Sequence, residues 1–354
     1  MTAPTNRQQG AAIITALLVV AMAAMLVSGL LWRQQIEIRR LENQRFRNQV
    51  QWAARGATDW AGLVLRNSSQ LAVTDTLKSR WARPLAPTRA SDLLNRHDTV
   101  DAAVYSTYVS GSIEDAQAYF NLRNLLASTV PGELHADPSE LQHFQRLLQL
   151  LGVDSRLAGP VALRLRTAML AQAGHMQGEM ACGTNGVIGA EQAPPATDSG
   201  ISDQAGLDND DALARPLQPL DLDWLLDVPG FTRETVDRLR PYATILPMRS
   251  MVNINTAPAQ VLAAMIVGLN LGQAQQLVHS RDQVDFLDVN DLINRLGERP
   301  AGLQPDANQL DVRSCFFIVH SRIDQERAHL VSDALLYRDP INHTTQIVRV
   351  RDLY

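Results

Sequence analysis

The chain has 354 residues, of which 45% are hydrophobic and 19% are charged, and its formal net charge is −5. This length is typical of two or three domains, and the apolar content is sufficient for folded cores. An acidic chain is a poor overall match for nucleic acid. The sequence contains no Gly-rich phosphate loop, metalloprotease helix or nucleophile elbow, so no enzyme activity is expected.

The N-terminal region combines a short polar leader with a long uncharged segment. The leader ends at Gly10, and residues 11–32 (AAIITALLVVAMAAMLVSGLLW) carry no charge before Arg33. As a helix rising 1.5 Å per residue, this segment spans roughly 30 Å, the thickness of the hydrocarbon core of a bilayer. Because backbone polar groups find no water in lipid, the segment is predicted to be a transmembrane helix.

Three interpretations of this segment compete. A cleaved signal peptide has a shorter apolar region followed by a small-x-small site, which is not found here. An uncleaved signal anchor is the simplest alternative. The third interpretation is a class III signal, cut between Gly10 and Ala11 on the cytoplasmic side, which leaves the apolar helix as the mature N-terminus.

The charges around the segment argue mildly against the class III orientation. Only Arg7 precedes the helix, whereas Arg33, Arg39 and Arg40 follow it. The positive-inside rule would place the more basic side in the cytoplasm. The class III interpretation therefore depends on the family resemblance described below.

The helix is predicted to continue beyond the apolar segment, to about residues 67–69. Apolar residues recur at spacings of three and four, which is typical of one helix face packed on protein. These residues are Phe46, Val50, Ala53, Ala57, Trp60 and Val64.

The remaining chain changes from strand to helix patterns and back. Residues 99–123 alternate like strands, with a turn at Gly111-Ser112 and a return strand over 118–122. Asp137-Pro138 predicts the start of a helical region, and Gly152 the end of its first helix. Further helices are expected over 157–173, 232–239, 259–269, 271–280 and 288–296. Three short strands are expected over 314–322, 329–337 and 346–350.

Residues 174–219 lose all periodicity and are predicted to form a long acidic loop. Clustered carboxylates on a bending loop can supply the oxygen ligands that calcium prefers. The candidate ligands are Asp198, Asp208, Asp210 and Asp211. No motif fixes the ligand set, and a solvated acidic linker is the alternative.

The chain contains two cysteines, Cys182 and Cys315. In an oxidising periplasm they could form one disulfide. Two unrelated buried thiols are the alternative.

Four segments together resemble the K-type minor pseudopilins of the type II secretion system, the general secretion pathway protein K family. They are Gly10-Ala11 with the apolar helix, residues 115–125 (DAQAYFNLRNL), 228–231 (VPGF) and 252–262 (VNINTAPAQVL). Each is weak alone, but their order and spacing are specific. The resemblance covers nearly the whole chain.

The resemblance implies an α+β fold in which a long, type IV pilin-like N-terminal helix packs on an antiparallel sheet and a large α-helical domain is inserted between strands. The expected parts are a cleaved leader (1–10), a transmembrane helix (11–32), the pilin-like helix and first strands (33–125), the inserted helical domain (126–310) and the C-terminal strands (311–354). It also implies calcium in the globular part.

The implied function is a minor pseudopilin that caps the pseudopilus tip and helps initiate its assembly for protein export. The implied location is the inner membrane, with a single span and the globular part in the periplasm. Partners would be the I- and J-type minor pseudopilins, prepilin peptidase and the inner-membrane secretion platform, and no nucleic acid is expected.

Thr15 departs from the ordinary pilin pattern, in which the fifth residue after the cleavage site is a glutamate. That glutamate pairs with the N-terminal ammonium of a neighbouring subunit, and an unpaired carboxylate in lipid is costly. A tip subunit has no subunit above it that needs this partner. Ala11 also differs from the usual phenylalanine or methionine, which leaves N-methylation after cleavage open.

Two alternatives remain at this stage. The VPGF turn and the Asn255-Thr256-Ala257 helix start resemble helix-hairpin-helix modules, which bind DNA phosphates through backbone amides. A membrane-anchored DNA-binding protein for uptake is therefore one alternative, although acidic residues oppose Arg233, Arg238, Arg240 and Arg249. A minor pilin of a type IV pilus is the other.

Overall fold

The computed structural model describes residues 8–93, 107–130, 133–170, 219–296, 308–325 and 328–353. The chain divides into two compact units. One contains residues 1–56, 88–109 and 322–330, and the other contains residues 57–87, 110–321 and 331–354.

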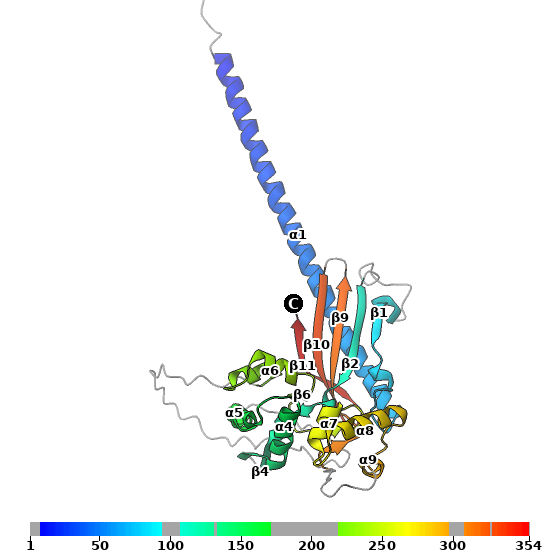
Figure 1. Ribbon diagram of the computed structural model, residues 1–354. Coiled ribbons are helices and arrows are strands. Elements are labelled where there is room, and N and C mark those ends of the chain that lie inside the picture. Colours follow the sequence, from blue (N-terminus) through cyan, green and yellow to red (C-terminus); the bar gives the residue numbers. More distant parts are fainter. Residues whose placement is uncertain are drawn as a thin grey trace, which may run out of the picture. The chain divides into compact units, whose positions relative to one another are not determined.

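Figure 1 shows the elements of the chain. The α-helices are α1 (Gln8–Leu71), α2 (Ala90–Leu93), α4 (Pro138–Leu150), α5 (Ala158–Leu170), α6 (Arg233–Leu239), α7 (Ala259–Met265), α8 (Leu271–Gln283) and α9 (Val289–Arg295). The 3₁₀ helices are η1 (Arg80–Ala82), η2 (Ala116–Ala118), η3 (Leu122–Leu125), η4 (Ser155–Leu157) and η5 (Leu222–Asp227). The strands are β1 (Leu85–Arg89), β2 (Thr107–Asp115), β3 (Phe120–Asn121), β4 (Leu126–Val130), β5 (Glu133–Ala136), β6 (Ala243–Thr244), β7 (Val252–Asn253), β8 (Leu310–Asp311), β9 (Phe316–Gln325), β10 (Ala328–Arg338) and β11 (Thr345–Leu353).

Helix α1 is continuous over 64 residues, which confirms that it extends well beyond the apolar segment. The face of α1 that packs on the protein is rotated about the helix axis relative to the predicted one. Ala54, Ala61 and Leu65 are buried, whereas Trp60, which was predicted to be buried, is 36% exposed. Small residues explain the rotation. A Cβ on Gly62 would lie 2.8 Å from Thr345 Oγ1, so a larger residue there would require the Thr345 side chain to shift.

The main sheet has five strands in the order β1-β2-β9-β10-β11. Neighbours β2 and β9 are separated in sequence by residues 116–315. Strands β10 and β11 are antiparallel, with Leu335 opposite Arg349. The long excursion between β2 and β9 contains the helices of the inserted domain (Figure 1). This arrangement confirms the predicted fold class and the three C-terminal strands.

The predicted turn at Gly111-Ser112 is wrong, because both residues lie inside β2. Gly111 instead allows the close approach of strand β9. A Cβ there would lie 2.2 Å from the His320 carbonyl oxygen. The predicted return strand is reduced to β3, and its neighbours form 3₁₀ turns that Asp115 and Asn121 cap with their side chains.

Most predicted helices of the inserted domain are confirmed. Asp137 caps α4, Thr232 caps α6, and Gly152 after α4 has a φ of 70°. Helix α7 ends before Ile266 rather than at residue 269, and Gly268 follows with a φ of 87°. Phe120 and Phe144 stack at 5.4 Å in the core of this domain.

The sheet has an apolar cluster on each face. On one face, Ala61 and Leu65 of α1 pack with Trp81, Phe317 and Leu336. On the other face, the cluster contains the buried side chains of Leu246, Met248, Phe316, Leu335 and Tyr337. The sheet is therefore covered by α1 on one side and by residues 246–248 of the inserted domain on the other.

Candidate functional site

The first half of α1 offers an apolar surface with no protein cover. The large hydrophobic side chains from Ile14 to Trp32 are all exposed, and α1 is long and apolar enough to cross a membrane. An exposed apolar surface of this length needs lipid or a partner helix. This finding agrees with a single N-terminal membrane anchor.

The predicted cleavage residues Gly10 and Ala11 lie in the first turn of α1, which begins at Gln8. The first four N–H groups of a helix have no intrahelical acceptor, so this turn opens at little cost.

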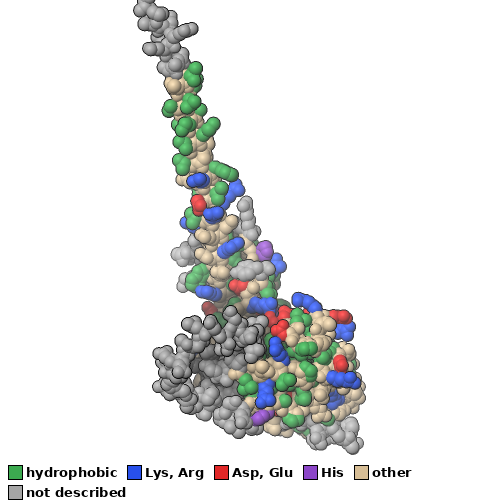
Figure 2. Space-filling model, turned by 90° about the vertical axis from the view of Figure 1, so that its left-hand side faces the viewer, with side chains coloured by type: hydrophobic (Ala, Val, Ile, Leu, Met, Phe, Trp, Pro, Cys, Tyr) green, Lys and Arg blue, Asp and Glu red, His purple; other side chains and the backbone are tan. Residues whose placement is uncertain are grey.

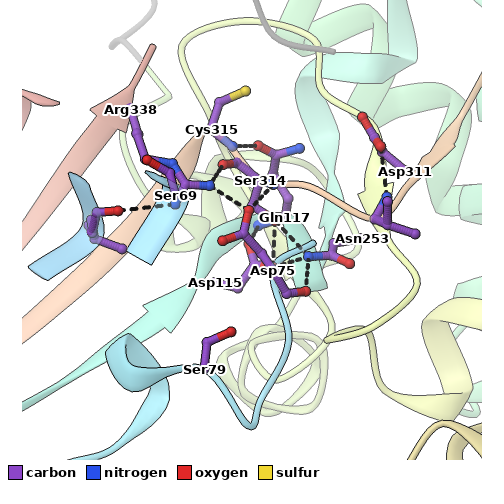
Figure 3. Close-up of polar contacts among 12 residues, drawn as sticks. Ser69, Asp75, Ser79, Asp115, Gln117, Asn253, Asp311, Ser314, Cys315 and Arg338 are labelled. Atoms are coloured by element: carbon purple, nitrogen blue, oxygen red, sulfur yellow. Dashed lines mark hydrogen bonds and ion pairs between the residues drawn. The ribbon is translucent and has the colours of Figure 1, made fainter. Parts of the chain in front are cut away.

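A second site lies where the chain leaves and re-enters the sheet. Figure 3 shows polar side chains from distant segments that meet there, among them Asp75, Asp115, Asn253, Ser314 and Arg338. Together with Thr256, which donates to Asp115, we call these residues the junction cluster. Asp115 ends β2 and Ser314 precedes β9, so the cluster joins both crossing points of the inserted domain. Every member is buried.

Asp115 is the centre of the junction cluster. Its Oδ2 accepts hydrogen bonds from Asn253 Nδ2 at 3.0 Å, Thr256 Oγ1 at 2.6 Å and Ser314 Oγ at 2.6 Å. Its Oδ1 accepts from the Gln117 backbone N–H at 2.8 Å. Burial raises the pKa of Asp115 to about 6, although the hydrogen bonds from Ser314 and Thr256 oppose that rise.

Asp75 and Arg338 form a buried ion pair beside Asp115. Arg338 Nη2 donates to Asp75 Oδ2 and, at 2.6 Å, to the Ser314 carbonyl oxygen. The Ser314 backbone N–H also donates to Asp75 Oδ2, at 3.0 Å. The Arg338 guanidinium carbon lies 4.7 Å from the centre of the Phe317 ring. This pair connects the loop after α1 to the end of β10.

The DAQAYFNLRNL segment supplies amide side chains that bind backbone groups of residues 246–251. Gln117 Nε2 donates to the Met251 carbonyl at 2.8 Å. Asn121 Nδ2 donates to the Met248 carbonyl at 2.8 Å, and Asn124 both donates to and accepts from the Ser250 backbone. Residues 246–251 lie outside the helices and strands of the described chain. The buried amide side chains therefore supply hydrogen-bond partners for the backbone N–H and C=O groups of this segment.

The VNINTAP segment is likewise structural. Asn255 exchanges two 2.8 Å hydrogen bonds with the backbone of Phe286. Arg281 donates to the carbonyls of Ile254 and Ala257 at 2.9 and 2.6 Å. Because Asn255 and Thr256 are buried, this turn is a packing motif rather than an exposed phosphate-binding helix start.

Three of the four arginines near the VPGF turn, all except the exposed Arg233, are ion-paired within the described residues. Arg238 pairs with Glu234 at 2.6 Å, Arg240 with Asp223 at 2.8 Å, and Arg249 with Asp137 at 2.8 Å. DNA binding needs cations that are free to meet phosphates. This geometry favours the packing interpretation of the helix-hairpin-helix resemblance.

A row of alternating charges crosses the sheet. His320 of β9 lies between Asp333 of β10, at 2.7 Å from Nδ1, and Glu114 of β2, at 3.1 Å from Nε2. Arg351 of β11 is opposite Asp333 in the register, and its Nη1 lies 2.5 Å from Asp221 Oδ2, just before η5. Hydrogen bonds to Asp333 and Glu114 raise the pKa of His320 to about 9.

We expect His320→Gln to remove a pH-dependent part of the stability. A histidine whose folded-state pKa is raised stabilises the fold fully below its unfolded pKa, and this contribution is lost as the pH rises through about 9. Because the ring is partly exposed, the effect should be only about 1 kcal/mol. Urea unfolding between neutral and alkaline pH measures it. His279→Gln, at an exposed position of α8, is the control substitution and should change the stability little.

The predicted metal and disulfide sites lie largely outside the described residues. Asp198, Asp208, Asp210, Asp211 and Cys182 are among the residues whose structure is not described. Cys315 is buried and lies immediately before β9. Within the described ranges, no group of three or more His, Cys, Asp or Glu side chains is arranged to hold a metal ion. Calcium binding and the Cys182–Cys315 disulfide stay predictions.

Comparison with known proteins assigns the chain to a family. Two family models, both described as type II secretion system protein K, match residues 118–248 and 252–313, which together make up more than half of the chain. The chain belongs to the protein K family of the type II secretion system. It is therefore a minor pseudopilin and a component of protein transport, which decides against the type IV pilus and DNA-uptake alternatives.

Individual relatives agree with this assignment. Type II secretion system protein K of Pseudomonas aeruginosa is 28% identical over 295 residues, which cover 82% of this chain and 77% of the relative. The Aeromonas hydrophila protein K is 24% identical over 92% of each chain. A chain of the crystal structure of the GspK-GspI-GspJ complex from enterotoxigenic Escherichia coli matches with a TM-score of 0.57 at 20% identity, covering 89% of this chain and 99% of that chain. This last likeness shows the fold.

The matched region 252–313 contains Asn253 and Thr256 of the junction cluster. The DAQAYFNLRNL and VNINTAP segments, singled out from the sequence, contact each other through Asp115 and Asn253. Asp75, Ser314 and Arg338 were missed, because isolated polar residues at the ends of a helix and of strands carry no recognisable spacing.

Proposed function

We propose that this chain, inserted in the inner membrane by α1 with its globular part in the periplasm, caps the tip of the pseudopilus and helps initiate its assembly. The observation that carries the proposal is the long insertion between the neighbouring strands β2 and β9. A pilin-like subunit with this bulk beside its sheet leaves no room for another subunit to stack above it. Thr15, in place of the usual glutamate, supports the same position.

Such a subunit would act by binding its partners and assembling with them, not by catalysing a reaction. The GspK chain of the structural relative was crystallised with GspI and GspJ. We therefore infer that the partners of this chain are the I- and J-type minor pseudopilins and the inner-membrane secretion platform. Recovery of I- and J-type proteins with the tagged full chain tests this, and their absence would contradict the tip role.

Prepilin peptidase is proposed to cut between Gly10 and Ala11. Gly10→Val is expected to block cleavage, because it places a β-branched side chain directly before the scissile bond, where the proposed signal has glycine. N-terminal sequencing of the protein from cells with and without the peptidase measures this. A wild-type chain starting at Ala11 only with the peptidase is the expected result.

Gly29→Val is the matched control. It places the same side chain in the same helix, at a position where a Cβ would meet nothing within 4 Å, and it should be processed normally. A mature product of normal size from the Gly10→Val variant would rule out the class III signal.

A further inference from the structure

The part of α1 that follows the apolar segment is strongly basic. From residue 33 to residue 56 it carries six arginines and two glutamates, and all of these side chains are exposed. Figure 2 shows this change on the helix, from green hydrophobic side chains to a stretch with many blue basic ones. Arg40 lies 3.4 Å from Glu37, but both side chains are more than 60% exposed, so water screens this pair.

Three of these arginines lie close to where a membrane surface would be. Arg33 follows Trp32, the last residue of the apolar segment, and tryptophan favours the membrane–water interface. At 1.5 Å per residue, Arg39 and Arg40 lie roughly 10–12 Å farther along the helix. The headgroup layer is roughly 5–8 Å thick on each side of the bilayer, and the Debye length is about 8 Å at physiological salt. All three guanidinium groups are therefore within electrostatic reach of lipid phosphates.

The same three arginines do not help insertion. With the globular part in the periplasm, they lie on the side that the positive-inside rule disfavours. A guanidinium group presents two parallel N–H donors to a phosphate, which makes arginine well suited to bind phosphate groups. The charge is thus better explained by binding than by topology.

We propose that Arg33, Arg39 and Arg40 form a binding surface for anionic phospholipid headgroups, which enriches these lipids around α1 and fixes the depth of the helix in the membrane. This proposal rests on the proposed function only for the side of the membrane on which the three arginines lie, which is the periplasmic side. The lipid preference itself needs neither cleavage nor partner subunits, so it can fail or hold independently of the tip role.

Quenching of Trp32 fluorescence by lipids brominated on their acyl chains tests this proposal. The full chain is reconstituted in phosphatidylcholine vesicles that contain either brominated phosphatidylglycerol or brominated phosphatidylcholine. The signal of a Trp32→Phe variant is subtracted to remove the other tryptophans. The net charge of the three arginines and Glu37 should favour phosphatidylglycerol roughly tenfold over phosphatidylcholine in low salt, and this preference should fall in high salt.

The triple variant R33Q/R39Q/R40Q is expected to bring the two lipids close to equal quenching. The variant R47Q/R55Q/R66Q makes the same charge change on exposed residues of the same helix, roughly 20 Å or more beyond Trp32, and should keep the preference. Equal quenching by both lipids around the wild-type chain, or equal effects of the two triple variants, would overturn the proposal. If the first triple variant keeps the lipid preference but no longer recovers partner pseudopilins, the arginines bind protein and the lipid proposal is wrong.

Discussion

Replacing Arg338 with methionine is expected to lower the free energy of unfolding by about 3–5 kcal/mol, because it leaves the buried Asp75 carboxylate without its cation. The Asp75 carboxylate would keep the hydrogen bond from the Ser314 backbone N–H, at 3.0 Å. The Ser314 carbonyl would also lose its 2.6 Å hydrogen bond from Arg338. The loop after α1, the start of β9 and the end of β10 would be loosened together.

Urea unfolding of the full chain in detergent, followed by tryptophan fluorescence, measures this loss. Trp81 is a suitable probe because it is 1% exposed and packs edge-on against Phe317, with ring centres 5.2 Å apart. Arg322→Met is the control, since its ion pair with Asp324 lies on the surface, and it should leave the unfolding midpoint nearly unchanged. An Arg338→Met chain with wild-type stability would show that the ion pair is dispensable.

The double variant Asp75→Asn/Arg338→Met separates loss of the charge from loss of packing. Asparagine removes the uncompensated negative charge and can still accept a hydrogen bond from the Ser314 N–H. We expect the double variant to be roughly 1–3 kcal/mol more stable than Arg338→Met alone. If it is less stable instead, the Asp75 carboxylate stabilises the fold even without Arg338, and the loss in Arg338→Met does not come from an uncompensated charge.

Local chemistry allowed much of the fold to be predicted. The caps at Asp137 and Thr232 are read directly from residue types, since their side chains accept hydrogen bonds from their own helix starts. The long helix follows from an apolar stretch that can only be satisfied as a helix in lipid. Both signals depend on residues that are adjacent in sequence.

Tertiary contacts decided what the sequence could not reveal. Gly111 was predicted to be a turn residue, but it lies in a strand, and its lack of a side chain allows the backbone of β9 to approach closely. Strand β1 was missed because Leu85–Arg89 contains a proline and has little alternation, as an edge strand allows. The junction cluster needed the fold itself, because Asp75, Asp115 and Arg338 are brought together from three distant segments.

Replacing Asp115 with alanine is expected to cost about 3–5 kcal/mol at neutral pH, because several buried donors lose their common acceptor while the relief from burying a charge offsets only part of this loss. Asp115→Asn should cost less, about 1–3 kcal/mol, because one N–H must then face another N–H whichever way the amide points. Asp237→Ala, at an exposed ion pair on α6, is the control and should cost under about 1 kcal/mol.

The pH dependence of these variants tests the role of the Asp115 charge. An acid whose pKa is raised on folding, here to about 6, stabilises the fold fully below its unfolded pKa of about 3.9, and this contribution is lost as the pH rises through about 6. The wild-type chain gains this stability on acidification and the Asp115→Asn chain does not, so the difference between them should be larger at pH 5 than at pH 7. Urea unfolding at both values measures it. A penalty that is independent of pH would mean that hydrogen-bond geometry alone, and not the ionisation of Asp115, determines how firmly the inserted domain is joined to the sheet.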